Sequence, residues 1–491
     1  MPAKTPDEKS ILASIRVPIA VTILLASFVF AMSASTRPSL SYTAVVFLLG
    51  VSIIAIIMGA TIQGHFFLAS PVGIMALYLL AFTGIPALTE FDSLSDSASV
   101  LSGYFIVGSA KTPVVLALFV ATYCAGALLS PQKCRNFNDI TFNNQPASLG
   151  LSNSAVVRLG RVALVVVGGY FTLTAITRDV SSRGVGQVIY NPTASLGVAM
   201  LIVGFGSTIV LLQSSASYSS LLASRWEWFL VLWPAVAHAA TGARHYAAGV
   251  VIVIGVYAIL RGRLRLKSFV VWLSSIVALN WAVEIYRSGE SFSLGGVGAL
   301  WDSLLRTTES VRGTTAVVVS LVPQVHPFYG GSTIISSVGQ VIPRPLIRIF
   351  VPDGTYGTGS YAFREVTGFD DPNQGFGFSL PAEGYLNWGV AGVAIAGFGV
   401  GCLSAILWKR LTIELTVASG SLYLMFAGYF TFMIRADFLS LLKWLVYGFI
   451  YFALVISVGR RAFNRNSRYL SQPKSGELTA RNSSHAREFR P

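Results

Sequence analysis

The chain has 491 residues, of which 53% are hydrophobic and only 11% are charged, and its formal net charge is +14. Soluble globular proteins carry roughly 25% charged residues, so this composition argues against a soluble enzyme. A basic balance would suit a nucleic-acid partner, but such proteins are usually rich in charge, and we expect no nucleic acid here. The three cysteines give neither a disulfide framework nor the spacing of metal ligands.

Long apolar stretches follow one another along most of the chain. A helix needs about 20 such residues to cross the hydrocarbon core of a membrane. The sequence therefore predicts an all-α polytopic membrane protein with about 12 transmembrane helices, of which the seventh and eighth form a short helical hairpin. The twelve expected spans lie near residues 12–32, 41–60, 65–88, 113–130, 162–177, 193–213, 227–241, 245–260, 268–286, 384–408, 415–434 and 438–458.

Basic residues fall mainly in alternate linkers, which predicts that both termini are cytoplasmic. The clearest cluster, Arg261 to Lys267, follows the eighth span. The excess positive charge then reflects the orientation of the protein in the membrane and does not require an anionic partner. Residues 459–491 are polar and basic, and we expect a disordered cytoplasmic tail, with contact to anionic lipid headgroups as an alternative. The first span could instead be a signal peptide cleaved after Ala31-Met32-Ser33, although its length favours an uncleaved helix.

Residues 287–380 interrupt the hydropathy pattern and form one large extracytoplasmic loop between spans 1–9 (residues 1–286) and spans 10–12 (residues 381–458). A loop of this length in a compact protein is usually structured and functional. Helical spacing from Gly298 to Val311 predicts an amphipathic helix at the membrane surface or over a cavity. The loop contains arginine but no lysine, which suggests anion binding, because a guanidinium is the better partner for phosphate oxygens. Ordinary surface charge, balanced by acidic residues of the loop, is the alternative and is preferred for a single loop arginine other than Arg344, which lies between two prolines.

Ionisable residues gather at the predicted outer ends of several spans. Arg244 follows the seventh span, Glu383 begins the tenth, and Arg435 and Asp437 lie between the last two. An ionisable residue at such a place is a functional candidate, although Arg435 and Asp437 could equally form a local ion pair. The chain has no phosphate loop, dinucleotide fingerprint or HExxH motif. Asp370-Asp371 is the only adjacent acidic pair and is typical of a turn more than of a metal site.

Four motifs in residues 225–445 carry a resemblance to a known family. They are Gly242-Ala243-Arg244, the pair Tyr329 to Ser332 and Val341 to Arg344, the stretch Glu383 to Gly392, and Ile434 to Asp437. In this order around a large loop, they resemble the O-antigen or oligosaccharide repeat-unit polymerases (Wzy type), which are GT-C-like lipid-sugar glycosyltransferases. The family often has Lys-Pro where this chain has Val351-Pro352-Asp353, so the resemblance is weaker there.

The resemblance implies a metal-independent, cofactor-free glycosyltransferase in the bacterial inner membrane, with its active site facing the periplasm. Its donor and acceptor would be undecaprenyl-diphosphate-linked glycans, and a chain-length regulator protein is a candidate partner. The growing glycan would pass from its lipid diphosphate to a sugar hydroxyl of the next lipid-linked unit. The resulting polymer would be an O-antigen, a capsule or an exopolysaccharide.

Candidate residues follow from this chemistry. A leaving lipid diphosphate develops negative charge, which converging arginines stabilise. We expect the proton acceptor for the sugar hydroxyl to be a carboxylate or an imidazole. Glu383 ranks first for that role, and orienting an arginine is its equally favoured alternative. The substrate-binding candidates are Arg244, Arg344, Arg364, Arg435, Tyr329 and Tyr385, and the catalytic candidates are Glu383, Asp437 and His326, with Glu365 as a further carboxylate; we expect no metal ligands.

Two other functions stay open. An O-antigen ligase would use the same donor and pass finished glycan to another acceptor. A transporter or flippase would favour internal repeats and broken helices with charges at mid-membrane. Here the loops are asymmetric and the charges lie at the outer ends, so the polymerase is the preferred interpretation.

Overall fold

The structure is a computed structural model in which helices dominate. It describes residues 8–89, 91, 99–101, 104–106, 110–130, 154–177, 192–214, 221–240, 245–262, 311–342, 357–367, 378–411 and 417–471.

Six of the described helices are long and apolar enough to cross a membrane. They are α1 (Glu8–Thr36), α2 (Ser41–Gln63), α7 (Ser154–Thr177), α8 (Pro192–Ser214), α16 (Leu380–Lys409) and α18 (Phe438–Ser471). Shorter helices stand among them: α6 (Lys111–Ala127), α9 (Arg225–Ala240), α10 (His245–Leu260) and α17 (Val417–Met433). A helical membrane protein is thus confirmed. The number of twelve spans stays a prediction, since the expected span 268–286 lies outside the described residues.

The third predicted span, 65–88, is not one regular helix. It consists of the 3-10 turn η2 (Gly64–Ala69), the π turns η3 (Pro71–Met75) and η4 (Leu80–Gly84), and the short helices α3 (Ala76–Leu79) and α4 (Ile85–Thr89). Proline inside the stretch removes a backbone donor and so breaks the regular ladder. Buried tyrosines replace lost partners, because the Tyr123 hydroxyl donates to the Pro71 carbonyl at 3.1 Å and Tyr423 donates to that of Ala69.

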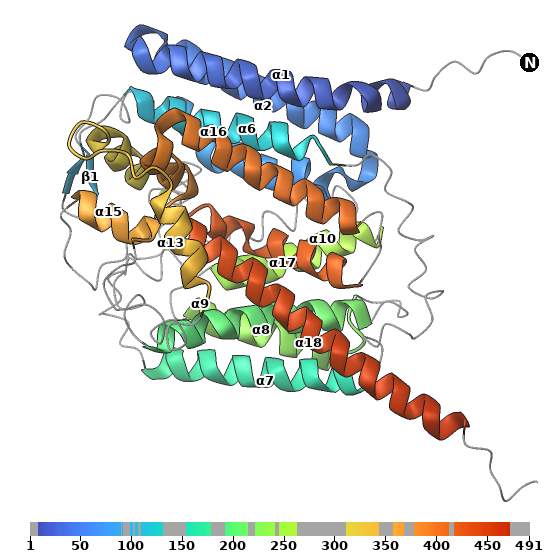
Figure 1. The fold of residues 1–491 in the computed structure, drawn as a ribbon. Coiled ribbons are helices and arrows are strands. Elements are labelled where there is room, and N and C mark those ends of the chain that lie inside the picture. The colour runs from blue at the N-terminus through green and yellow to red at the C-terminus, as the bar shows by residue number, and fades with distance from the viewer. Residues whose placement is uncertain are drawn as a thin grey trace, which may run out of the picture.

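The long helices lie side by side in one bundle (Figure 1). Helix α1 and α2, joined by the turn η1 (Pro38–Leu40), pack on α6; α16 lies between α6 and α17, and α8, α9 and α7 complete the other side. Helix α1 begins and α18 ends at one end of the bundle, while α13 (Ser332–Gln340) and α15 (Gly359–Thr367) lie at the opposite end. This arrangement agrees with both termini on one side of a membrane and the large loop on the other.

Helices α6 and α16 approach each other through small residues. A Cβ atom added at Gly397 would lie 2.7 Å from the Phe119 carbonyl oxygen, and one at Gly401 would lie 2.3 Å from that of Tyr123. Such small-xxx-small spacing lets membrane helices pack backbone to backbone. The outer faces of the bundle instead carry large apolar side chains that are exposed. Leu25 on α1 and Ile176 on α7 are 58% and 77% exposed, as expected for side chains that face lipid.

A partly buried ion pair connects α7 to α9. The Arg161 guanidinium lies 2.6 Å from the Glu227 carboxylate, whose second oxygen accepts the Ala223 N–H at 2.7 Å. Glu227 is 1% exposed and is therefore held by both partners. Arg161, a basic residue on the predicted cytoplasmic side, therefore also makes a structural contact between two helices.

The described part of the large loop contains α13, α15 and a buried helix over Val311–Leu321. The sequence predicted helical segments in the loop but did not place these three. The amphipathic helix expected from Gly298 lies outside the described residues, apart from Val311 at its end. A short antiparallel hairpin, β1 (Ser99–Leu101) and β2 (Tyr104–Ile106), was not predicted. Helix α18 continues to Ser471, so the first part of the expected disordered tail is helical; residues 472–491 lie outside the described part.

Candidate functional site

Helix α16 is broken inside its predicted membrane span. Trp388 (φ −143°, ψ 23°) and Gly389 (φ 60°, ψ −141°) leave the helical conformation, and the positive φ at Gly389 is one that glycine adopts without strain. The two parts of the helix then press together, because a Cβ atom on Gly392 would lie 1.9 Å from the Gly384 carbonyl oxygen. The glycines of the Glu383–Gly392 motif are therefore explained by this break.

The turn before α13 supplies the hydrogen bonds that the break would otherwise lose. The Tyr329 N–H donates to the Leu386 carbonyl at 3.1 Å, and the Gly330 N–H donates to the Asn387 carbonyl at 3.1 Å. The Gly331 N–H donates to Asn387 Oδ1 at 3.0 Å. Irregular backbone at membrane depth is tolerated only where protein or water satisfies it. Two motifs more than fifty residues apart thus complete each other.

Glu383 lies at the centre of this junction and is 2% exposed. Its Oε1 accepts the Thr333 hydroxyl of α13 at 2.9 Å, and its Oε2 accepts the Phe438 N–H at 2.6 Å. Phe438 is the first residue of α18, whose early N–H groups have no partner within their own helix. The Gly359 backbone packs on the carboxylate, since a Cβ atom there would lie 2.6 Å from Glu383 Cδ. Glu383 therefore joins α13, α15, α16 and α18.

Asn387 extends the same network one helical turn further along α16. Its Nδ2 donates to Thr333 Oγ1 and to the Glu383 carbonyl, both at 2.8 Å. Asn387 and Thr333 are both fully buried, so their mutual hydrogen bonds replace those to water.

Asp437 is the other buried carboxylate of the junction, at 6% exposure. Its Oδ1 accepts the N–H and the hydroxyl of Ser440, at 3.0 and 2.9 Å, which is the pattern of an N-cap residue. Its Oδ2 accepts the Ser360 hydroxyl of α15 at 2.8 Å. We call Glu383, Asp437, Thr333, Asn387 and Ser360 the carboxylate cluster.

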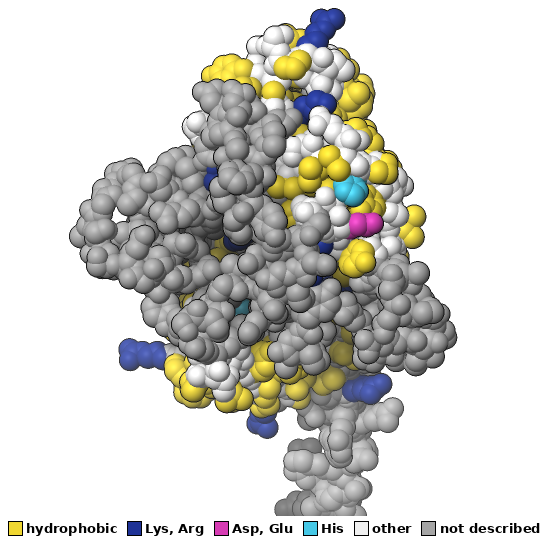
Figure 2. Space-filling view, turned by 90° about the vertical axis from the view of Figure 1, so that its left-hand side faces the viewer, with side chains coloured by type: hydrophobic (Ala, Val, Ile, Leu, Met, Phe, Trp, Pro, Cys, Tyr) yellow, Lys and Arg dark blue, Asp and Glu magenta, His cyan; other side chains and the backbone are white. Residues whose placement is uncertain are grey.

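An exposed pair lies beside this cluster. The Tyr329 phenol donates to Glu365 Oε2 of α15 at 2.9 Å, and Glu365 is exposed. Partial burial, and then the hydrogen bond and negative charge of Glu365, raise the pKa of Tyr329, so the phenol stays protonated and donates. Arg364 and His326 are half-buried at the same end of the molecule. Figure 2 looks onto this end and shows acidic and histidine side chains among hydrophobic ones.

Tyr385 does not face solvent. It is 3% exposed, and its ring packs edge-on against Phe328 with 6.1 Å between the centroids. Tyr385 was predicted to bind substrate, but its buried ring offers no exposed face for such a contact. Trp388, three residues along the broken helix, is 41% exposed and is the more accessible aromatic side chain.

Arg435 follows α17 on the other side of the junction. It is half-buried, and the preceding Ile434 carbonyl accepts the Leu380 N–H at 3.3 Å. In the same turn, Phe432 packs on His245 with 4.4 Å between ring centroids, and His245 lies 4.8 Å from His238. The end of α17 therefore meets the start of α10, directly after Arg244 in the chain. Arg244 and Arg344 themselves lie outside the described residues.

Comparisons with protein-family models, curated proteins and solved structures gave no match for this chain. The resemblance to polymerases therefore stays a prediction. Among the residues that the structure describes, no group of three His, Cys, Asp or Glu side chains could hold a metal ion.

Several polar residues of the junction were missed by sequence reasoning. Thr333, Asn387 and Ser360 are uncharged, so only their place inside or near the motifs could have indicated a role for them. Arg312 is a 7% exposed cation on the Val311–Leu321 helix, and burial lowers its pKa to about 10, which still leaves it charged at neutral pH. On the same helix, the Thr315 hydroxyl lies 3.2 Å from that of Ser379, the N-cap of α16.

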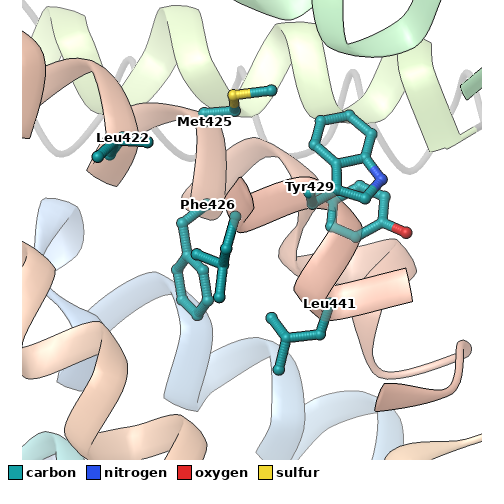
Figure 3. Close-up of a pocket in the computed structure, with 7 residues that line it drawn as sticks. Leu422, Met425, Phe426, Tyr429 and Leu441 are labelled. Carbon is teal, nitrogen blue, oxygen red and sulfur yellow. The ribbon is translucent and has the colours of Figure 1, made fainter. Parts of the chain in front are cut away.

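An apolar pocket lies next to the cluster, between α17 and α18 (Figure 3). Tyr429 and Trp444 stack along one side with 3.7 Å between their ring centroids. Leu441, another lining residue, is in the first turn of α18 and donates its N–H to the Asp437 carbonyl at 3.4 Å. The pocket has no ionisable side chain other than a tyrosine, so it offers hydrophobic contact and no acid or base. Its lining consists of Leu422, Met425, Phe426, Tyr429, Leu441, Trp444 and Leu445.

Proposed function

We propose that the chain is a polymerase of undecaprenyl-diphosphate-linked oligosaccharide repeat units. The supporting observation is that three of the motif segments meet in one hydrogen-bonded junction. Tyr329–Ser332 closes the break in Glu383–Gly392, and Glu383 binds the helix that follows Ile434–Asp437. Segments that only shared a sequence pattern by chance would have no reason to meet. The active site in this proposal faces the periplasm, at the α13–α15 end of the bundle.

In the proposed reaction, the bond between the sugar C1 and the lipid diphosphate breaks as the acceptor hydroxyl oxygen bonds to C1. The diphosphate leaves with the electron pair of the broken bond. Arg364 and Arg435, together with Arg244 and Arg344, stabilise the negative charge that develops on it. The hydroxyl proton passes to a carboxylate of the protein.

We assign that carboxylate to Glu365 in place of Glu383. Both oxygens of Glu383 already accept hydrogen bonds in a 2% exposed position, which suits a residue that positions helices. Glu365 is exposed, and one oxygen accepts the Tyr329 phenol at 2.9 Å, which leaves the other free to meet a sugar hydroxyl. Asp437 has the same helix-capping character as Glu383 and also becomes a positioning residue.

The test is a polymerisation assay with purified protein in lipid nanodiscs and a defined undecaprenyl-diphosphate-linked repeat unit. We expect a ladder of products on a gel. Glu365→Gln should abolish the ladder without changing the elution profile of the protein. Arg158→Gln, an exposed change on the predicted cytoplasmic side of α7, is the control and should leave the ladder intact. No elongation of an authenticated cognate substrate by the wild type would overturn the proposed function.

Glu383→Gln separates the two carboxylates. If Glu383 only positions α18, the variant should lose thermal stability but retain measurable turnover at low temperature. Complete loss of turnover in a variant that is still folded would return the role of base to Glu383. A single transfer to an added acceptor, without a ladder, would instead favour the ligase.

The break in α16 is the one observation that favours a transporter, since broken helices form the binding sites of many transporters. In those sites the freed carbonyls line a cavity. Here the carbonyls of Leu386 and Asn387 accept the N–H groups of Tyr329 and Gly330. The break is therefore closed by protein, which makes the transporter the weaker proposal.

A further inference from the structure

Helix α13 has its polar side chains inside and its apolar side chains outside. Thr333 and Ser337 are fully buried, and the Ser337 hydroxyl donates to the Thr333 carbonyl at 2.7 Å. Ile335 and Val338, one turn apart on α13, are 73% and 59% exposed, and Ile342, two residues beyond the end of α13, is 52% exposed. A helix on a water-facing surface would show the opposite pattern. We call these three residues the α13 stripe.

The stripe continues the lipid-facing surface of α18. The Tyr447 hydroxyl of α18 donates to the Val341 carbonyl at the end of α13, at 2.6 Å. Val446, next to Tyr447, and Phe449, less than one turn further on, are 37% and 60% exposed. Because α18 crosses the membrane over Phe438–Gly459, its exposed apolar residues are expected to contact acyl chains. Ile342 adjoins that surface.

A contact at the start of α13 also indicates where this helix lies relative to the membrane surface. Gly331, its N-cap, lies against the indole of Trp388, since a Cβ atom there would be 2.5 Å from the ring. Trp388 is 41% exposed, and exposed tryptophans gather where the membrane meets water. Helix α13 thus runs from that boundary to the level of the Tyr447 side chain on a membrane-spanning helix. Its sequence, Ser332 to Gln340, contains no charged residue that would oppose this position.

We propose that α13 is embedded in the outer leaflet of the membrane, with its stripe in contact with lipid acyl chains. Helix α13 then separates the membrane hydrocarbon on one side from the carboxylate cluster on the other. Residues 332–342, assigned by sequence to an external loop, belong to the membrane-embedded part of the protein. This inference concerns the location of α13 and does not depend on the polymerase proposal.

The test measures what surrounds α13 in liposomes of phosphatidylethanolamine and phosphatidylglycerol. Single cysteines replace Ile335 and Val338 in a variant whose three native cysteines are changed to alanine, and each carries a nitroxide label. Power saturation then compares collisions with oxygen, which concentrates in lipid, and with nickel ethylenediaminediacetate, which stays in water. A label at Phe449 on α18 is the lipid reference, and one at Glu365 on α15 is the water reference.

We expect labels at 335 and 338 to resemble the one at 449, with oxygen collisions exceeding nickel collisions, and the label at 365 to show the reverse. Nickel access at 335 and 338 equal to that at 365 would place the stripe in water and overturn the proposal. Low collision rates with both reagents would also overturn it, because protein would then cover the stripe. Two labelled positions, each checked by size-exclusion profile against the cysteine-free protein, protect the result from a single misfolded variant.

Discussion

The close contact across the break in α16 makes Gly392→Ala the sharpest test of the junction. The new methyl carbon would lie 1.9 Å from the Gly384 carbonyl oxygen, far inside van der Waals contact. Neither atom is at the end of a flexible side chain, so one part of α16 must move relative to the other. Overpacking of this kind costs about 1–3 kcal/mol and sometimes more.

The movement would have a second cost at the turn before α13. The two carbonyls at the break would separate from the N–H groups of Tyr329 and Gly330, which now lie at 3.1 Å. Each buried polar group left without a partner costs about 1–3 kcal/mol. We therefore expect Gly392→Ala to lose several kcal/mol in total, seen as a clear fall in the midpoint of thermal unfolding in a fixed detergent.

Gly399→Ala is the matched control because it lies in the same helix and a Cβ atom there meets nothing within 4 Å. Alanine is favoured over glycine in a helix by about 1 kcal/mol, so this variant should be as stable as the wild type or slightly more stable. If Gly392→Ala and Gly399→Ala unfold at the same temperature, α16 is not broken as described, and the account of the junction is wrong.

Three further changes test other contacts. Thr333→Val removes the hydroxyl between two buried partners and should cost about 1–3 kcal/mol, whereas Thr333→Ser should retain most of the stability; thermal unfolding of the pair distinguishes a lost hydrogen bond from lost packing. Tyr123→Phe removes the bond to the Pro71 carbonyl and should cost about 1 kcal/mol, with unchanged stability as the contrary result. Glu227→Ala should destabilise more than Glu227→Gln, because only glutamine can still accept a hydrogen bond from Arg161; equal unfolding midpoints would contradict that contact.

The sequence predicted the membrane class and the approximate positions of the six described helices that are long and apolar enough to cross a membrane. These features depend on hydropathy and on charges beside apolar runs, and both are local properties of the chain. The irregular structure of segment 64–89 was missed because its sequence is a long apolar stretch, like that of a regular span. Its prolines gave a signal, but the tyrosine hydroxyls that stabilise the irregular backbone come from α6 and α17. The sequence of residues 64–89 does not indicate which distant residues will form these hydrogen bonds.

The candidate site was predicted in part for a similar reason. Charged residues at helix ends pointed to Glu383 and Asp437, and both lie in one junction. Thr333, which donates to Glu383, and Ser360, which donates to Asp437, are uncharged and could not be identified in this way, although they occupy carboxylate oxygens. Tyr385, a predicted substrate-binding residue, is only 3% exposed, because a tyrosine in the first turn of a span can point inward as easily as outward.

The geometry of the two carboxylates gives the junction a definite physical character. Glu383 and Asp437 come from different segments, yet both accept backbone N–H groups in the first turn of α18. The first N–H groups of a helix have no partner within the helix, so the carboxyl oxygens of Glu383 and Asp437 satisfy donors that would otherwise be unpaired. Thr333 and Ser360 then bind α13 and α15 to the same carboxylates. Any ligand that moved α13 or α15 would therefore pull directly on the start of a membrane-spanning helix, and Glu365 on α15 is the exposed group through which such a ligand could act.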